Sequence, residues 1–392
     1  MNRNRKKILF LCSWYPSEIS PTNGNFVQKH AESVQLNNDV IVLSIFSSII
    51  HNEIRLEEND NQGIREIIVY YPKRTILSIP NYFLHYKAFR LGFEKAEKHI
   101  GKIDLVHLNV IFPLGIWALW LKWFQNIPYV ITEHSTYYNS NSTHEKSKFK
   151  IWFAKVILNR SSMTLPVSED LGRSLKKISS KVSMQYISNV VDAKVFKLKS
   201  DKSNKNRTNF IHISTAIEKH KNVSGIIRVF SELYKTRTDF QLHFVSDGDI
   251  ESLKILVNQL KLDSVITFYP TRSTDEIAEM IASSDALVLF SNYENFPCVI
   301  AESLMCGVPV ISTNVNGIPE HVNSTNGILV NRGDDEELLR ALNDFLDGKF
   351  TFNPIDLRNY ALKHFSYEEV SLKYNEVYEQ VLQNNNIRLN QL

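Results

Sequence analysis

Short apolar segments alternate with amphipathic ones along most of the chain. In the first half, apolar segments predict strands at Lys7 to Trp14, Asp39 to Phe46, Ile64 to Tyr71, Asp104 to Asn109, Tyr129 to Glu133, Met163 to Val167 and Met184 to Ile187. Helices are expected at Phe26 to Leu36, Tyr82 to His99, Leu114 to Phe124, Phe149 to Arg160 and Glu169 to Lys177. This alternation predicts an α/β fold in which a mainly parallel sheet carries helices on both faces.

The alternation restarts after a polar, charged segment that we interpret as an interdomain linker. Strands are then expected at Phe210 to Ser214, Gln241 to Val245, Val265 to Tyr269, Ala286 to Phe290, Val310 to Thr313 and Gly327 to Val330. Helices are expected at Val223 to Tyr234, Ile250 to Leu260, Thr274 to Ser283, Asp334 to Leu346 and Tyr367 to Leu382. We therefore predict a first domain at 1–196, a linker at 197–209 and a second domain at 210–366, with the C-terminal helix, about 367–392, packing back on the first domain.

Length and charge agree with two globular domains. A chain of 392 residues exceeds what one hydrophobic core normally serves, and 43% of its residues are hydrophobic, as in ordinary soluble proteins. The formal net charge of +3 gives no general case for a nucleic-acid partner. Positive charge is nevertheless concentrated from Lys146 to Lys181, where nine Lys or Arg residues stand against Glu169 and Asp170. This imbalance predicts a basic face in the first half.

Cysteine usage and hydropathy bear on the compartment. The three cysteines, Cys12, Cys298 and Cys306, show no metal-ligand spacing, and their odd number fits a reducing cytoplasm. The basic start leads into only a short apolar run, so no secretory signal is expected. The most hydrophobic segment, Leu105 to Leu121, contains polar residues and falls short of the roughly 20 apolar residues that a membrane span needs. We therefore expect a cytoplasmic protein.

Two acidic residues of the second half, Glu294 and Glu302, are candidates for ligand binding. Glu294 is expected in the loop at the carboxyl end of a strand, where open α/β sheets bind ligands, and Glu302 in the helix that follows. Asn295, Phe296 and Pro297 are expected to open that helix, whose first amides suit an anionic group. A carboxylate pair for hydroxyls beside amides for phosphate suits a nucleotide sugar. Two glutamates at this spacing in a helix usually form a solvated face, however.

Four further residues are candidates for ligand binding. Gly24 and Asn25 lie between the first strand and the first helix, where backbone amides can bind a diphosphate, although a structural turn explains them equally well. His134 follows a strand and can donate to a sugar hydroxyl or a phosphate. Lys221 precedes a helix, where a cation opposes the dipole, and phosphate binding would explain it. The alternative for Lys221 is a solvated run of charge.

Two segments suggest functions that simpler structure also explains. Asp247, Gly248 and Asp249 place two acids as in some metal sites, but Asp-Gly after a strand is usually turn and cap chemistry, so no metal is expected. The segment FKIWFAKVI, from Phe149 to Ile157, places aromatic residues among lysines. It fits an interfacial helix on anionic lipid, and equally an ordinary amphipathic helix with a basic outer face, which is the simpler interpretation.

Several motifs of the second half occur together at familiar spacings. They are KN at Lys221 and Asn222, SDG at Ser246 to Gly248, FSNYENFPCVIAESLMCGVPVIST from Phe290 to Thr313, NGIPE at Asn316 to Glu320, and then NGILV. The first half matches more loosely, at the Gly24 loop, ITEH, VSEDL and ISNVVDAKVF. On these motifs the chain resembles glycosyltransferase family 4, retaining enzymes with an E(x)7E motif. The resemblance implies the GT-B fold, two facing Rossmann-like domains with a donor/acceptor cleft between them.

The resemblance also implies roles for single residues. Glu302 is expected to bind the ribose hydroxyls of the donor, and Glu294 the transferred sugar. The amides of the segment Asn295 to Cys298 are expected to hold the sugar or the diphosphate, and Lys221 to neutralise the diphosphate. His134 is expected to contact the sugar at the cleavage point.

Other implied contacts surround the diphosphate. Gly24 and Asn25 are expected to approach it from the first domain, and Gly248 belongs to the donor-binding set. The family usually has an arginine five residues before the lysine, where this chain has Ala216. Neutralisation of phosphate would then depend on Lys221 alone or draw on Lys219 or Arg272.

The implied activity is that of a retaining hexosyltransferase that requires neither a metal nor a cofactor. Its donor would be a UDP- or GDP-sugar, and its acceptor a glycan or lipid-linked molecule in bacterial surface polysaccharide biosynthesis. Peripheral contact with an anionic membrane, at its inner face, would follow from a lipid-linked acceptor. Two alternatives stay open: a catalytically silent relative that binds nucleotide sugar or acts as a scaffold, suggested by Ala216, and a nucleotide-sugar epimerase of the same fold.

Overall fold

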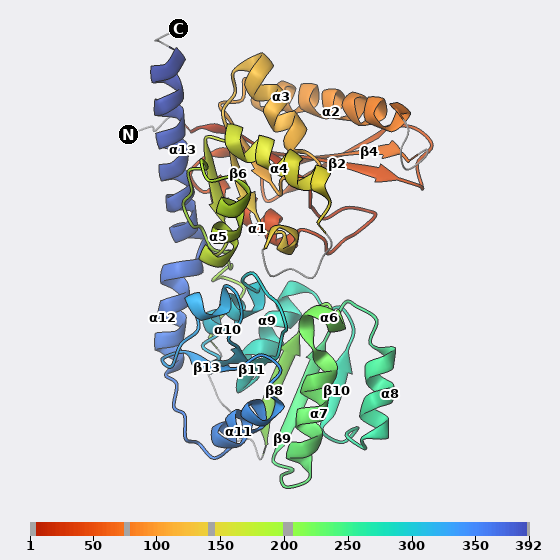
Figure 1. The fold of residues 1–392 in the computed structure, drawn as a ribbon, viewed down its shortest axis with the longest axis vertical. Coiled ribbons are helices and arrows are strands. Elements are labelled where there is room, and N and C mark those ends of the chain that lie inside the picture. The colour runs from red at the N-terminus through yellow and green to blue at the C-terminus, as the bar shows by residue number, and fades with distance from the viewer. Residues whose placement is uncertain (1–4, 74–78, 140–145, 199–206, 390–392) are drawn as a thin grey trace. The chain divides into compact units, whose positions relative to one another are not determined.

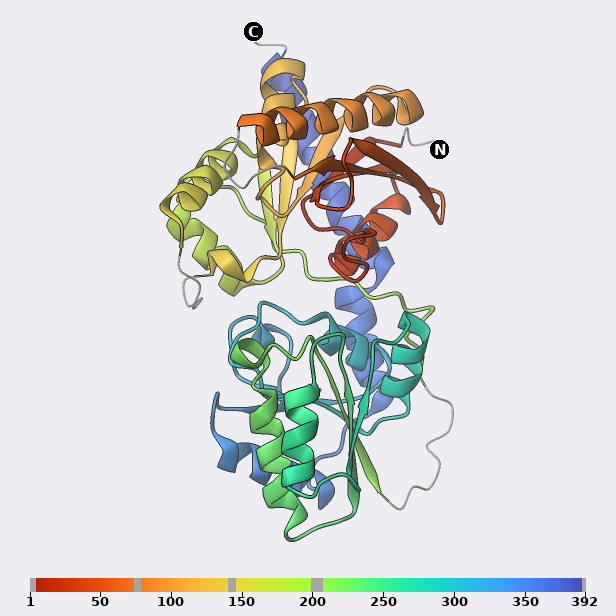
Figure 2. The same cartoon turned by 90° about the vertical axis from the view of Figure 1, so that its right-hand side faces the viewer.

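The computed structural model describes residues 5–73, 79–139, 146–198 and 207–389. The chain divides into two compact units, unit 1 with Met1–Val190 and Tyr367–Leu392, and unit 2 with Val191–Ser366 (Figures 1 and 2). Most of the predicted linker lies outside the described residues, and its last two residues, Thr208 and Asn209, belong to the first strand of unit 2. Each unit is an α/β layer structure, so the predicted fold class is confirmed.

Unit 1 is built on a seven-stranded sheet in the order β3-β4-β2-β1-β5-β6-β7. Its strands are β1 (Lys7–Cys12), β2 (Asp39–Ser48), β3 (Arg55–Asn61), β4 (Ile64–Pro72), β5 (Leu105–Asn109), β6 (Tyr129–Glu133) and β7 (Met163–Pro166). Neighbouring strands are parallel except β3 and β4, which form an antiparallel hairpin at one edge. The central strands read as nearly continuous apolar runs because helices cover both faces of a parallel sheet.

The helices of unit 1 fall into two groups. α1 (Asn25–Gln35) and α13 (Tyr367–Leu389) pack on one face of the sheet. The other face carries α2 (Ile79–Ile100), α3 (Gly115–Gln125), α4 (Lys148–Arg160) and α5 (Glu169–Ile178), and a short 3-10 helix, η1 (Thr136–Tyr138), follows β6. The apolar stripe of α13 is buried against α1 and the sheet, so the last helix of the chain belongs to unit 1.

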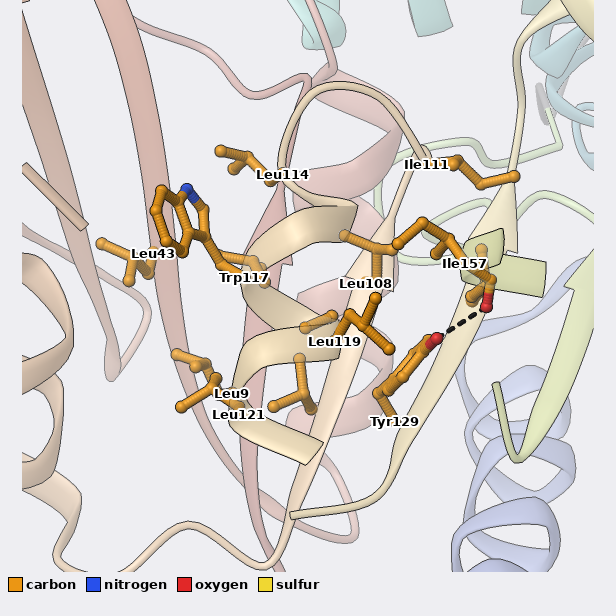
Figure 3. Close-up of a cluster of buried hydrophobic side chains, with 14 of the residues drawn as sticks. Leu9, Leu43, Leu108, Ile111, Leu114, Trp117, Leu119, Leu121, Tyr129 and Ile157 are labelled. Carbon is orange, nitrogen blue, oxygen red and sulfur yellow. Dashed lines mark hydrogen bonds between the residues drawn. The ribbon is translucent and has the colours of Figure 1, made fainter. Parts of the chain in front are cut away.

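The core beneath α3 shows how these layers are joined (Figure 3). Trp117 of α3 stacks on Phe89 of α2 with ring centroids 4.6 Å apart. The hydroxyl of Tyr129 on β6 donates to the carbonyl oxygen of Ile157 on α4 at 2.6 Å, drawn as a dashed line in Figure 3. Leu108 of β5 is fully buried in the same cluster. Strands and helices of this face therefore share one continuous core.

Unit 2 is built on a parallel sheet in the order β10-β9-β8-β11-β12-β13. Its strands are β8 (Thr208–Ile213), β9 (Phe240–Val245), β10 (Ile266–Tyr269), β11 (Ala286–Leu289), β12 (Val310–Thr313) and β13 (Gly327–Val330). One face carries α7 (Val223–Tyr234), α8 (Glu251–Gln259) and α11 (Asp335–Leu346); the other carries α9 (Thr274–Ala282), α10 (Cys298–Met305) and α12 (Pro354–Phe365). Two short helices, α6 (Glu218–Lys221) and η2 (Ile318–Glu320), lie in loops.

Three details differ from the prediction. The strand expected at Met184 to Ile187 is wrong, because the segment has one isolated bridge, from Met184 to Thr164, and no regular strand. It still lies along the edge of β7, where Gln185 N donates to Thr164 O at 3.1 Å and Ile187 N to Pro166 O at 3.3 Å. β3 was not predicted because its polar sequence, RLEENDN, suits a partly exposed edge strand with no apolar alternation. α12 was also missed, although the Asn353 side chain caps it and Pro354 opens it, both ordinary signals of a helix start.

Replacing Leu108 by Ala tests the core of unit 1. We expect the free energy of unfolding to fall by about 2–5 kcal/mol, because the cavity adds to the lost transfer energy. All five tryptophans lie between Trp14 and Trp152, so tryptophan fluorescence in a urea titration follows unit 1 alone. Leu91→Ala, at an exposed position of α2, is the matched control and should change stability by about 0.5 kcal/mol or less. Equal effects of the two variants would contradict the assignment of Leu108 to the core.

Candidate functional site

The strand order of unit 2 reverses between β8 and β11. From β8 the chain continues outward through β9 and β10, whereas β11 is followed by β12 and β13 on the opposite side. Ligands of open α/β sheets bind outside the carboxyl ends of the strands at such a switch point. At this switch point the loop after β11 is hydrogen-bonded to the loop after β8. Asn292 N and Tyr293 N donate to His220 O at 2.8 and 3.3 Å.

Lys221 and Glu294 form a partly buried ion pair at this switch point. Lys221 Nζ lies 2.5 Å from Glu294 Oε1, and Ser291 Oγ donates to the same oxygen at 2.9 Å. Glu294 N donates to Asn316 Oδ1 at 3.3 Å, and Thr313 Oγ1 donates to Ser291 O at 2.7 Å. Glu294 is only 7% exposed. The loops after β8, β11 and β12 thus converge on Glu294 and its neighbour Ser291. The structure brings together Lys221 and Glu294, which the sequence proposed separately.

Glu302 lies in α10 and is 8% exposed. This burial excludes the solvated face that its spacing from Glu294 alone suggested. α10 begins at Cys298, with Pro297 at its N-cap. Asn295 and Phe296 therefore lie in the preceding loop and do not open the helix as expected. Pro297 has no polar side chain with which to cap the helix, whose N-terminal dipole favours a negative charge.

The ring of Phe296 is part of the hydrophobic core of unit 2. Its ring stacks with Phe365 at a centroid distance of 5.3 Å and contacts His321 at 4.6 Å. The neighbouring Asn295 is also buried. The side chain of Phe296 anchors the loop, so a contribution of this residue to donor binding would come from its backbone, as the resemblance implies.

Gly248 and Ala216 lie in the loops after β9 and β8. A Cβ atom on Gly248 would come within 2.1 Å of Thr215 O, so only glycine allows the two loops to pack this closely. Ala216 has φ +54°, and its N–H donates to Ser214 Oγ at 3.1 Å. The position that carries an arginine in the family thus supplies no charge here.

Arg272 lies in the loop after β10. Its guanidinium pairs with Glu276 at 3.0 Å and lies over the Tyr269 ring at 5.7 Å. It also lines a cavity of about 890 Å³ on unit 2, together with residues such as His243 and Lys194. Arg272 thus contacts residues of α9 and β10, whereas Lys221 forms the ion pair with Glu294.

Gly24 is the N-cap of α1 in unit 1. It has φ +77°, and a Cβ atom there would come within 2.6 Å of the backbone of Trp14 and Tyr15. Glycine is therefore required by the fold of this loop. Asn25, the first residue of the helix, is exposed. The first strand-to-helix loop of an α/β unit is where phosphate groups approach most closely.

His134 follows β6 and packs against α1. Its ring centroid lies 4.6 Å from that of Phe26 and 5.3 Å from that of His30. Burial first, and then the nearby His30 and His107, hold the pKa of His134 well below its usual value. His134 is therefore neutral near pH 7 and can act on a ligand through a hydrogen bond rather than through charge.

Glu133 was not selected from the sequence, yet it organises the loops beside His134. Its carboxylate accepts hydrogen bonds from Ile111 N at 2.9 Å, His134 N at 3.0 Å and Ser135 N at 2.7 Å. Burial raises its pKa to about 7, although the three amide donors act in the opposite direction. The sequence placed this acid at the end of a strand, but not its side chain among three amides.

Two family descriptions match consecutive parts of the chain. Glycosyltransferase Family 4 matches residues 35–195, and Glycosyl transferases group 1 matches residues 195–363. The chain belongs to glycosyltransferase family 4. The motifs that carried the resemblance therefore identified the family correctly.

Relatives and solved structures agree with this family. N-acetyl-alpha-D-glucosaminyl L-malate synthase of Bacillus anthracis is 26% identical over 305 residues, which cover 71% of this chain and 75% of the relative. Anabaena Alr3699/HepE in complex with UDP and glucose has a TM-score of 0.74 at 17% identity, covering 96% of this chain and 100% of that one. The apo lipopolysaccharide outer core galactosyltransferase WaaB has a TM-score of 0.68 at 15% identity, covering 95% and 99%. The structural likenesses show that this glycosyltransferase has the GT-B fold.

Within residues 5–73, 79–139, 146–198 and 207–389, no helix is both long enough and apolar enough to cross a bilayer.

The buried histidines of unit 1 predict a loss of stability in mild acid. Burial lowers the pKa of His30 from 6.5 to about 4, so the unfolded chain binds a proton between these values that the folded chain does not. Stability is then fully present above pH 6.5 and falls as pH drops toward 4, by about 3 kcal/mol for His30 alone. Urea titrations followed by tryptophan fluorescence should show a weaker pH dependence for His30→Gln. If the free energy of unfolding of the variant changes with pH below 6.5 as steeply as that of the wild type, this account is contradicted. Above pH 7 the free energies of unfolding of the two proteins should change with pH in the same way.

Proposed function

We propose that this glycosyltransferase moves a sugar from a nucleoside diphosphate sugar to a hydroxyl of a glycan or lipid-linked acceptor, with retention of configuration and without a required metal ion. The observation that carries the proposal is the partly buried Lys221–Glu294 ion pair at the switch point of unit 2. A pair so placed offers a cation and a carboxylate to one small polar ligand.

The two partners suit different ends of a nucleotide sugar. The Lys221 ammonium carries three N–H groups, of which one points to Glu294, so the others can bind oxygens of a diphosphate. Carboxylates such as Glu294 and Glu302 accept strong hydrogen bonds from hydroxyl groups. Because both glutamates are buried, water competes weakly for these bonds.

Departure of a diphosphate concentrates negative charge on its oxygens. Lys221 and the N-terminal end of α10 can stabilise that charge without moving, which is the usual source of the largest catalytic effect. Since Ala216 supplies no charge, Lys221 provides the positive charge that stabilises the departing diphosphate. The departing phosphate can take the proton of the acceptor hydroxyl on the same face of the sugar, so no protein nucleophile is required.

The donor is proposed to be a UDP- or GDP-sugar. A solved structure of similar fold, that of Anabaena Alr3699/HepE, contains UDP and glucose, which supports a nucleoside diphosphate donor.

The outer surface of unit 1 supports a lipid-linked acceptor. Phe149 and Trp152 of α4 are 59% and 60% exposed, and Trp123 and Phe124 of α3 are 54% and 69% exposed. Lysines flank them, among them Lys150, which lies over the Phe112 ring at 4.9 Å. Exposed aromatics beside cations suit the interface of an anionic membrane. A role in surface polysaccharide biosynthesis on the inner face of the membrane follows from such an acceptor.

Glu302→Gln tests the proposed donor site. Gln keeps the size of the side chain but loses the charge that strengthens a hydrogen bond to a hydroxyl, so we expect kcat/KM for sugar transfer to fall on the order of a hundredfold or more. The melting temperature should stay close to that of the wild type. Glu336→Gln, at an exposed position of α11, is the matched control and should transfer normally. Full activity of Glu302→Gln would contradict the assignment.

A thermal-shift screen over UDP- and GDP-sugars identifies the donor, because a ligand of the folded state raises the melting temperature by mass action. Incubating the stabilising donor with and without acceptor then separates the alternatives. Donor binding with neither transfer nor hydrolysis would indicate a silent binding protein. An epimeric donor formed without acceptor would indicate an epimerase.

Replacing Phe149 and Trp152 together by Ser tests membrane contact. We expect binding to vesicles that contain anionic phosphatidylglycerol to fall about tenfold, because apolar area and interfacial aromatics are lost. Cosedimentation with vesicles measures this binding. Phe350→Ser removes an exposed aromatic of unit 2 and should leave binding unchanged. Equal binding by neutral and anionic vesicles, or no effect of the double variant, would contradict the proposal.

A further inference from the structure

A chain of buried hydrogen bonds links the C-terminal helix to the residues beside His134, all within unit 1. Its members, in the order in which the hydrogen bonds connect them, are Tyr378, His107, Thr132, Tyr374, His30 and Asn189. We propose that this chain makes α13 part of the functional site, with Tyr374 as a positioning residue that acts on His134 through His30 and Asn189. The inference rests on the proposed function insofar as His134 contacts the sugar.

The chain crosses four structural elements and the segment after α5 without a solvent-exposed member. Tyr378 OH lies 2.6 Å from His107 Nδ1, and His107 Nε2 lies 2.7 Å from Thr132 Oγ1. Thr132 Oγ1 lies 3.4 Å from Tyr374 OH, which in turn lies 3.1 Å from His30 Nδ1. The chain ends where His30 Nε2 meets Asn189 Oδ1 at 3.4 Å. The histidines, the tyrosines and Thr132 are fully buried, and Asn189 is 5% exposed.

The direction of the chain follows from its end at Asn189. Burial lowers the pKa of His30 to about 4, so the ring is neutral near pH 7 and has one N–H. An amide oxygen can only accept, and therefore His30 must carry its proton on Nε2 and donate to Asn189 Oδ1. Nδ1 of His30 is then an acceptor, so Tyr374 must donate its hydroxyl proton to it.

The remaining members follow in the same way. Because Tyr374 has used its proton, its oxygen can only accept from Thr132 Oγ1–H. Thr132 must then accept from His107 Nε2–H, and Nδ1 of the neutral His107 accepts from Tyr378. Each hydroxyl donates once and accepts at most once within the chain. One amide oxygen therefore sets the tautomer of both histidines and the direction of every hydroxyl.

The chain of hydrogen bonds reaches His134 through its last member, Asn189. Asn189 also hydrogen bonds to His134, and the His30 ring lies 5.3 Å from the His134 ring. His30 and Phe26, which flank His134, belong to α1, the helix that begins after Gly24. A shift of Asn189 or His30 therefore changes the orientation of the His134 ring, and small errors in such positions lower turnover strongly.

Tyr374→Phe breaks the chain at its centre while keeping the ring. His30 Nδ1 then lacks a donor and Thr132 lacks an acceptor, and both groups are buried. We expect kcat for sugar transfer to fall on the order of tenfold, with the KM of the donor changed by about twofold or less. NMR of imidazole nitrogens should show altered signals of His30 and His134 and mixed tautomers at His107.

Tyr367→Phe is the matched control. Tyr367 also lies on α13, and its hydroxyl also donates to a residue of α1, Glu32, at 2.6 Å, but it is not a member of the chain. This variant removes a comparable link between the two helices. We expect its kcat and its His134 signals to match those of the wild type.

Substitutions at Thr132 provide a second test that does not alter α13. Thr132→Val keeps the shape but removes the hydroxyl, and should reproduce the loss of kcat. Thr132→Ser keeps the hydroxyl and should restore it. A purely structural role would lower stability in these variants without separating Ser from Val in kcat.

The outcomes separate the inference from the proposed function. If Tyr374→Phe and Tyr367→Phe have the same kcat and the same His134 signals, the inference is overturned while sugar transfer stands. If the wild type transfers no sugar, the proposed function fails, and the NMR signals alone decide the positioning of His134. Altered His134 signals in Tyr374→Phe but not in Tyr367→Phe then support the chain, and unaltered signals overturn it.

Discussion

Burial of parallel strands on both faces is the constraint on which both units depend. Strands such as β5 and β6 are hydrogen-bonded to a neighbouring strand on either side and covered by helices on both faces. Their side chains are therefore buried and cannot contact a ligand from solvent. Polar groups that are to bind a ligand must therefore come from the loops at the strand ends or from the helices that begin there. Glu294, Lys221 and His134 all lie in such loops or in a short helix within one. The fold thus decides where function can lie before it decides what the function is.

Within unit 2, the loops after β8, β11 and β12 are held together by polar contacts with Glu294 and Ser291. A buried ion pair is costly to desolvate, and removing one partner of such a pair typically costs about 3–5 kcal/mol because the other charge is left uncompensated. Glu294 is the buried partner and Lys221 is partly exposed. Ser291 and Asn316 add hydrogen bonds to the glutamate, which offset part of the cost of its burial. Such a pair contributes little to stability by itself, which agrees with the donor-binding role that we propose for it.

Unit 1 meets the same problem with neutral groups. His30, His107 and His134 are buried close together, and desolvation favours their uncharged forms. Neutral imidazoles can be buried at moderate cost provided that each nitrogen has a partner, and hydroxyls from α13 supply partners for two of the rings. The C-terminal helix therefore does more than cover apolar surface: it completes the hydrogen bonding of groups that β5 and α1 place in the core.

The sequence by itself determined the α/β alternation, the family and most of the residues at the switch point, because hydrophobic periodicity and short motifs are local properties. It did not determine that β3 pairs with β4 at the edge of the sheet. A strand of polar residues has no hydrophobic pattern, so it is recognised only by the strand with which it pairs. It left Glu294 and Glu302 undecided between a ligand site and a solvated face, because burial depends on what packs around a helix. It also placed Phe296 at the donor without showing that its ring belongs to the core.

Only the tertiary structure joined Lys221 to Glu294, 73 positions apart, and Tyr374 to His30, 344 positions apart. Contacts between such distant residues are set by the order of strands and the packing of helices, which no local pattern records.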